Sequence, residues 1–153
     1  MTEKEKAERG SIDEVLRSLE KINLLMDQNK LAEAKDLVKE TEAELLQFPQ
    51  NLETIQYGAN LGGQMIDLGA WTDDVKLIRK GVKFVENLVL RLPEEKLFIN
   101  HLYNLANGYS AIKKQIHASQ FEKGILPKEH ILEKATYRKA IRLAQTKELE
   151  THE

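Results

Sequence analysis

The side chains best suited to acid–base or metal chemistry near neutral pH are the histidines, and the chain has four of them. A helical di-iron site needs a glutamate three residues before each ligating histidine, and none of the four has one. The H-E-x-x-H zinc motif is also missing. His130 and Glu133 share one face of an expected helix, but no second pair accompanies them. His101 is therefore interpreted as an ordinary helix residue rather than a ligand.

Motifs for covalent and phosphate chemistry are missing as well. The sequence has no cysteine, no Walker loop and no G-x-S-x-G nucleophile motif. Gly58 and the Gly62-Gly63 pair lie inside a predicted helix, where they cannot form a strand-to-helix loop that cradles phosphate. We expect a protein that is not an enzyme and that uses no cofactor and no metal.

Composition narrows the class of protein further. The chain has 153 residues, 41% hydrophobic and 31% charged, with a formal net charge of −2, which suits one soluble helical domain. This charge gives no global field to attract nucleic acid or an anionic membrane. No apolar run is long enough to span a membrane, and residues 1–9 have no apolar core typical of a secretory signal. The expected location is cytoplasmic.

Apolar spacing and the few chain breakers predict an all-α protein. Only three prolines and eight glycines occur, and apolar residues recur at helical i, i+3, i+4 spacing between them. A flexible charged lead-in is expected over residues 1–10, followed by one helical domain over 11–153. The predicted helices are 12–26, 31–48, 52–69, 73–91, 94–117 and 129–149, grouped in pairs over about 11–49, 51–92 and 94–149.

Several residues are expected at helix ends. Ser11 and Glu14 have the spacing of a capping box, and Asn51 precedes the third helix as an N-cap. Gly69 is expected to end that helix. Trp71, in the turn that follows, is predicted to pack over the helix pair.

One segment combines aromatic, amide and small residues in a recognisable order, Leu102-Tyr103-Asn104-Leu105-Ala106-Asn107-Gly108-Tyr109. It resembles the first helix of a tetratricopeptide repeat (TPR), whose pattern runs roughly W-Y-N-L-G-N-A-Y. A weaker copy lies upstream in Tyr57-Gly58-Ala59-Asn60-Leu61-Gly62-Gly63-Gln64-Met65. The resemblance implies an all-α fold of three antiparallel helix pairs stacked as a short right-handed TPR-like α-solenoid.

Aligning Gly62 with Ala106 places the two copies 44 residues apart, against a family repeat of about 34. These small residues, with Gly81 and Ala140 in the second helices, are predicted to lie where paired helices approach closely. Within the motif, Leu105, Ala106 and Tyr109 are expected to pack.

In the TPR family the first helix of each pair lines a concave face that binds peptides. Positions matched to that face are rich in amides, which both donate and accept hydrogen bonds. The predicted peptide-binding residues are Gln56, Asn60, Gly63, Asp67, Asn100, Tyr103, Asn104, Asn107 and Ser110. The alternative is that Asn104 and Asn107 only bond neighbouring helices.

The resemblance implies a non-catalytic scaffold that binds a protein or peptide segment. Some family members clamp a C-terminal carboxylate with Lys and Arg, but the matched positions here hold neither. We therefore expect an extended or helical peptide held mainly by amide contacts. Only Arg17 or Lys21 of the first helix could contribute a clamp residue.

A basic helix face offers the competing interpretation. Lys76, Arg79, Lys80 and Lys83 recur at i, i+3, i+4, i+7, with Lys113 and Lys114 as further candidates. Such a face could bind nucleic acid, although a solvated surface is the simpler interpretation. A helical domain that forms homo-oligomers is the other alternative, and either could be attached to a separate effector domain. Further repeats or domains are expected after Glu153.

Overall fold

The computed structural model describes residues 2–93, 99–116 and 128–152, and these residues form helices joined by turns. Within these ranges there are six helices and no strand, which confirms the all-α prediction. The predicted start of the fifth helix at 94 and the predicted loop over 118–128 fall largely outside the described residues. The helices are α1 (Glu3–Asp27), α2 (Leu31–Leu45), α3 (Leu52–Trp71), α4 (Val75–Val89), α5 (Ile99–Ile116) and α7 (Lys128–His152).

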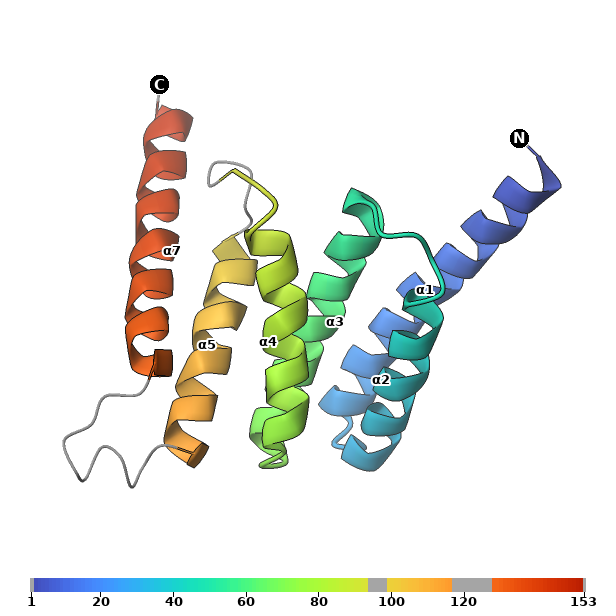
Figure 1. Ribbon diagram of the computed structural model, residues 1–153, viewed down its shortest axis with the longest axis horizontal. Coiled ribbons are helices and arrows are strands. Elements are labelled where there is room, and N and C mark those ends of the chain that lie inside the picture. The colour runs from blue at the N-terminus through green and yellow to red at the C-terminus, as the bar shows by residue number, and fades with distance from the viewer. Residues whose placement is uncertain (1, 94–98, 117–127, 153) are drawn as a thin grey trace.

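The helices stand side by side in one row from α1 to α7 (Figure 1). Helices adjacent in sequence contact each other along the whole row. In addition, α3 contacts both α1 and α5, across one intervening helix in each case. This second set of contacts brings the first, third and fifth helices together on one side of the row.

Several predicted helix ends differ from the structure, and α2 for example ends at Leu45 rather than at 48. The first helix begins at Glu3, so residues 3–10, expected as a lead-in, are helical and Ser11 lies inside α1 rather than at its N-cap. Gly69 does not end α3, which continues to Trp71. Gly69 is buried instead against α4, where an added Cβ would lie 2.7 Å from Ile78 Cγ1.

Asn29 and Asp73 take the left-handed position in two turns, and only at the second had glycine been expected, as Gly69. Asn29 and Asp73 have φ of 59° and 55°, in the left-handed region that these two residue types tolerate. After α1, the amide of Lys30 donates to the carbonyl of Leu25 at 2.8 Å, and after α3 the amide of Asp74 donates to that of Gly69 at 2.8 Å. These bonds satisfy carbonyls that a helix end leaves open.

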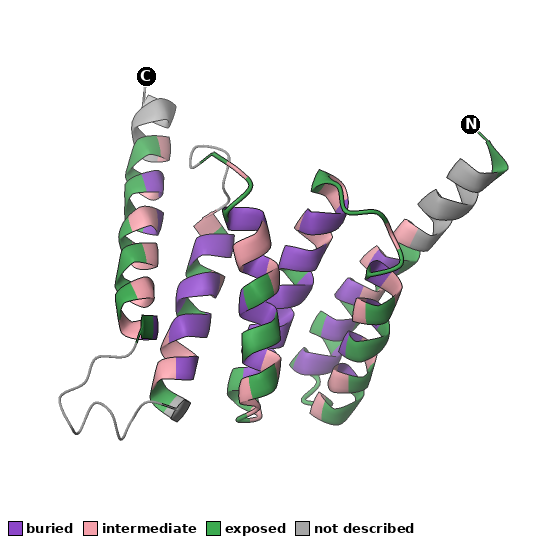
Figure 2. Cartoon of the chain, in the orientation of Figure 1, coloured by how far each residue is buried: buried purple, intermediate pink, exposed green. Residues whose placement is uncertain are grey.

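The core consists of two large apolar clusters that meet at α3. Leu61, Met65 and Leu68 of α3 belong to a cluster shared with α1 and α2, whereas Ile66 belongs to one shared with α4, α5 and α7. Burial is concentrated on α3 to α5, and most of α7 is exposed or intermediate (Figure 2). Leu105, Ala106 and Tyr109 are buried, as predicted for the packing residues of the repeat motif.

Glycine allows α3 and α4 to approach closely. A Cβ added to Gly62 would lie 2.6 Å from the carbonyl oxygen of Gly81, and one added to Gly81 would clash with the carbonyl of Gly62. Only residues without a side chain permit this spacing. The prediction that Gly62 and Gly81 mark a helix contact is confirmed.

Trp71 is 56% exposed, which contradicts the prediction that it packs over the helix pair. It is the last residue of α3, and the turn that follows crosses to α4 without covering it.

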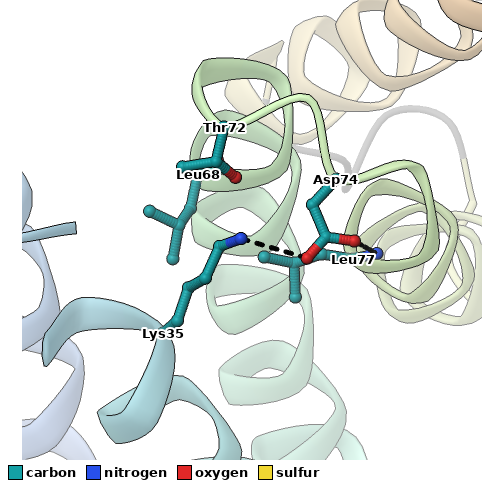
Figure 3. A network of polar contacts seen from close by, with 5 residues as sticks. All are labelled: Lys35, Leu68, Thr72, Asp74 and Leu77. Atoms are coloured by element: carbon teal, nitrogen blue, oxygen red, sulfur yellow. Dashed lines mark hydrogen bonds and ion pairs between the residues drawn. The ribbon is translucent and has the colours of Figure 1, made fainter. Parts of the chain in front are cut away.

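Asp74 links three elements at the start of α4 (Figure 3). Its carboxylate accepts the amide of Leu77 at 3.2 Å as the helix N-cap and pairs with Lys35 of α2 at 3.1 Å. Nearby, the Thr72 hydroxyl donates to the carbonyl of Leu68 at 2.8 Å. The hydrogen bond from Lys35 and then that from Leu77 hold the pKa of Asp74 below its usual value.

Replacing Asp74 separates the two roles of its carboxylate. Asp74→Ala loses both the cap and the ion pair, and we expect a loss of about 1–2 kcal/mol in unfolding free energy. Asp74→Asn keeps a good cap and loses only the charge, and we expect about 0.5 kcal/mol at neutral pH because the pair is partly exposed. Urea unfolding measures both losses.

The pH dependence of the stability lost in Asp74→Asn shows whether the ion pair with Lys35 causes that loss. Because the folded pKa of Asp74 is lowered, its extra stability is present above the unfolded pKa of about 3.9 and disappears as pH falls through the folded value. The difference between wild type and Asp74→Asn should therefore vanish in strong acid. An equal difference in unfolding free energy at neutral pH and in strong acid would contradict the ion-pair role.

Candidate polar groove

A polar groove with a volume of about 360 Å³ lies between α1, α3 and α5. Four of the predicted binding residues line it: Asn60, Gly63 and Asp67 from α3, and Asn104 from α5. The structure adds a third wall from α1, but neither Arg17 nor Lys21, the two α1 residues considered from the sequence, lines it. The α1 residues that line the groove are Leu16, Leu19, Glu20 and Asn23.

Gly63 makes room for the side chain of Asn104. A Cβ at Gly63 would lie 2.7 Å from the Asn104 amide nitrogen, so the amide rests directly on the backbone of α3. Asn60 is exposed and Asn104 partly buried. The two amides, one on α3 and one on α5, therefore remain partly accessible to solvent.

Gln64 is a groove residue that the sequence analysis missed. Its side chain is 8% exposed, and its amide nitrogen donates to the Leu19 carbonyl at 2.7 Å and to the Asn23 side-chain oxygen at 3.0 Å. The amide oxygen of Gln64 is buried and accepts no hydrogen bond within the described part of the chain. A glutamine inside the apolar run from Leu61 to Ile66 was the available sequence signal.

Both charged residues that line the groove are acidic. Glu20 is exposed at one wall and Asp67 at another, and no ion pair joins either to a described residue. Although Asp67 is exposed, the protein around it partly desolvates its carboxylate and raises its pKa above the usual value, because desolvation disfavours the charged form. The groove thus combines carboxylates and amides without a lining cation.

Part of the predicted set bonds a neighbouring helix instead. The hydroxyl of Tyr137 on α7 donates to the side-chain oxygen of Asn107 at 2.8 Å. The rings of Tyr103 and Tyr137 lie 6.1 Å apart between centroids, in a tilted arrangement. Asn107 and Tyr103 therefore join α5 to α7, which supports the inter-helix alternative for this half of the motif.

The remaining predicted residues lie outside the groove. Gln56 and Ser110 are partly buried and Asn100 is exposed, and none of them lines it. Helical spacing placed them on the expected face of α3 or α5, but the groove covers only the middle of that face.

The basic face of α4 is paired in part with an acidic residue of the neighbouring helix α2. Lys76, Arg79, Lys80 and Lys83 are all exposed, and Lys80 pairs with Glu42 of α2 at 3.2 Å. Lys113 is engaged elsewhere, with Glu133 of α7. The face is therefore interrupted by at least one carboxylate.

A larger hollow of about 430 Å³ lies between α4, α5 and α7 and is lined mainly by apolar side chains such as Leu102 and Leu132. Its polar wall is already bonded, because the Tyr109 hydroxyl donates to Glu86 at 2.6 Å. This contact and burial raise the pKa of the Tyr109 phenol. We assign no ligand to this hollow.

The described residues contain no group of three or more His, Asp or Glu placed to hold a metal ion. His101 is buried, and burial lowers its pKa below the usual value. No described helix is both long and apolar enough to cross a membrane.

Fold and site together define an all-helical protein with an acidic, amide-lined groove. No protein-family model matches the chain, and the searches of curated proteins and of solved structures found no match.

Proposed function

We propose that the chain is a non-catalytic interaction module that binds a peptide or protein segment in the groove between α1, α3 and α5. The observation that carries the proposal is the convergence of amides from all three helices, Asn23, Asn60 and Asn104, on one groove. Side-chain amides can pair with both the N–H and the C=O of a peptide backbone.

The helix contacts support a TPR-like arrangement for this module. In such a solenoid, three antiparallel pairs stack with a right-handed turn, and the first helices of successive pairs contact one another along a concave face. The contacts of α3 with α1 and α5 have this pattern, as does the close Gly62–Gly81 contact within the second pair.

The size of the groove limits the size of the partner segment that it can bind. Its volume of about 360 Å³ lies near the lower end of the range of about 300–1,000 Å³ typical of ligand sites. The groove would therefore hold a few residues of a partner rather than a folded domain.

The test is selection of peptides from a phage-displayed library of random short peptides on the immobilised protein. Synthetic copies of the selected peptides are then measured by fluorescence anisotropy. We expect Asn60→Ala and Asn104→Ala each to weaken binding by about tenfold, the equivalent of one lost hydrogen bond of about 1.4 kcal/mol. Helicity and melting should stay near wild type, because neither amide is fully buried.

Asn87→Ala is the matched control. This amide lies on α4, and among the described residues it accepts a hydrogen bond only from the exposed Arg91 four residues later, at 2.9 Å. It should leave peptide affinity unchanged. Recovery of no peptide, or equal loss in Asn87→Ala, would refute the proposal, and unfolding of the Asn60 and Asn104 variants would make those residues structural.

A further inference from the structure

We propose that the groove selects a peptide segment that carries Lys or Arg side chains. This inference rests on the proposed function and specifies the chemistry of its partner. Glu20 and Asp67 would bind the cationic groups, while Asn23, Asn60 and Asn104 bond the peptide backbone.

Charge is the first argument. The lining residues include two carboxylates and no Lys, Arg or His. A cation that enters the groove meets acceptors on two walls, one from α1 and one from α3. An acidic segment would meet two like charges in a partly desolvated space, which is unfavourable.

The unsatisfied oxygen of Gln64 is the second and independent argument. Gln64 lines the groove, is more than nine-tenths buried, and uses its amide nitrogen on Leu19 and Asn23. Its oxygen is left without a donor among the described residues. A buried acceptor without a donor is unfavourable, and an N–H donor of a ligand that reaches it from the groove would relieve this state. Lysine, arginine and the peptide backbone all supply such donors.

The state of Asp67 is the third argument. The residue is exposed, yet the surrounding protein partly desolvates its carboxylate and raises its pKa, and no described residue pairs with it. A cationic ligand would supply the counter-charge that this carboxylate lacks in the unliganded protein.

The experiment compares three versions of the full chain in the same peptide selection. The first is wild type, the second is Glu20→Gln with Asp67→Asn, and the third is Asp36→Asn with Glu40→Gln. The third removes the same two charges from the exposed face of α2, away from the groove. Both double variants change net charge equally, so a difference between them reports the groove.

We expect peptides selected on wild type and on the α2 control to be enriched in Lys and Arg. Their affinity, measured by anisotropy, should fall at least tenfold in the Glu20/Asp67 variant, because each lost charge-assisted contact corresponds to roughly a factor of ten or more. Its melting temperature should stay near that of wild type, because Glu20 and Asp67 are both exposed. Binding that also weakens as salt rises supports the same assignment.

Several outcomes would overturn the inference while leaving the proposed function intact. Selected peptides without a basic preference would do so, as would equal affinity of the Glu20/Asp67 variant for basic peptides. Spermidine that binds as tightly as a peptide of the same charge would contradict the proposed function as well, because the groove would then recognise cations and not a peptide segment. If no peptide of any kind is selected, the proposed function itself fails.

Discussion

Gly62→Ala is expected to destabilise the protein by about 2–3 kcal/mol, which is a large part of the stability of about 5–15 kcal/mol typical of a domain. The new Cβ would lie 2.6 Å from the Gly81 carbonyl oxygen and 2.8 Å from Phe84 Cβ. The carbonyl belongs to the backbone of α4 and cannot rotate away, so α3 and α4 must move apart. Alanine's better helix propensity, about 1 kcal/mol, offsets only part of the strain.

Gly58→Ala is the control, on the same helix and one turn earlier. Its added Cβ would meet Phe84 Cδ1 at 3.0 Å, which is the end of a side chain that can adjust. We expect its unfolding free energy to stay within about 1 kcal/mol of wild type. In a thermal melt, Gly62→Ala should unfold about 10 °C lower. Equal melting of the two variants would show that the helices do not approach as closely as described.

Lys113→Met is expected to have the second large effect, a loss of about 2–3 kcal/mol in unfolding free energy. The Lys113 ammonium pairs with Glu133 across the contact between α5 and α7, and the two side chains are only 17% and 15% exposed. The ammonium also lies 3.4 Å from the His130 Nδ1. Methionine keeps the length of the side chain but leaves the Glu133 carboxylate without its cation in a poorly solvated place.

A double-variant cycle separates packing from charge. Lys113→Met combined with Glu133→Leu removes both charges and should recover most of the lost stability, since an apolar pair can replace a buried ion pair. Lys80→Met is the exposed comparison, because Lys80 pairs with Glu42 while 56% of its side chain is exposed. We expect it to lose less than about 1 kcal/mol. Denaturant unfolding measures Lys113→Met, Glu133→Leu, their combination and Lys80→Met, and no recovery in the double variant would contradict this account.

The helices and several of their ends could be predicted because their causes are local. The apolar spacing of α4, for example, places Ile78, Val82 and Val85 on one face, and all three are buried. Asn51 caps α3 through the amide of Thr54, as its position before the helix predicted. Exceptions arise where tertiary contacts override local rules: Gly69 lies in the contact between α3 and α4 rather than at a turn, and Asp73 supplies the left-handed residue instead.

The candidate site was only half predictable, for a geometric reason. Helical spacing shows which residues share a face but not the angle at which that face meets its neighbours. Asn104 and Asn107 lie one turn apart on α5, yet Asn104 rests on Gly63 of α3 whereas Asn107 bonds Tyr137 of α7. No rule of spacing within α5 separates them.

The sequence by itself determined an all-helical chain and which small residues let its helices approach, because both follow from periodicity and side-chain size along one segment. Only the tertiary structure decided which polar groups meet. Glu20 and Asn23 line the same groove as Asp67 because α1 and α3 pack side by side. For the same reason the amide nitrogen of Gln64 donates to α1, while its oxygen accepts no hydrogen bond from a described residue. Contacts between segments some 40 residues apart depend on how each helix is rotated and placed, which the packing of the whole core determines.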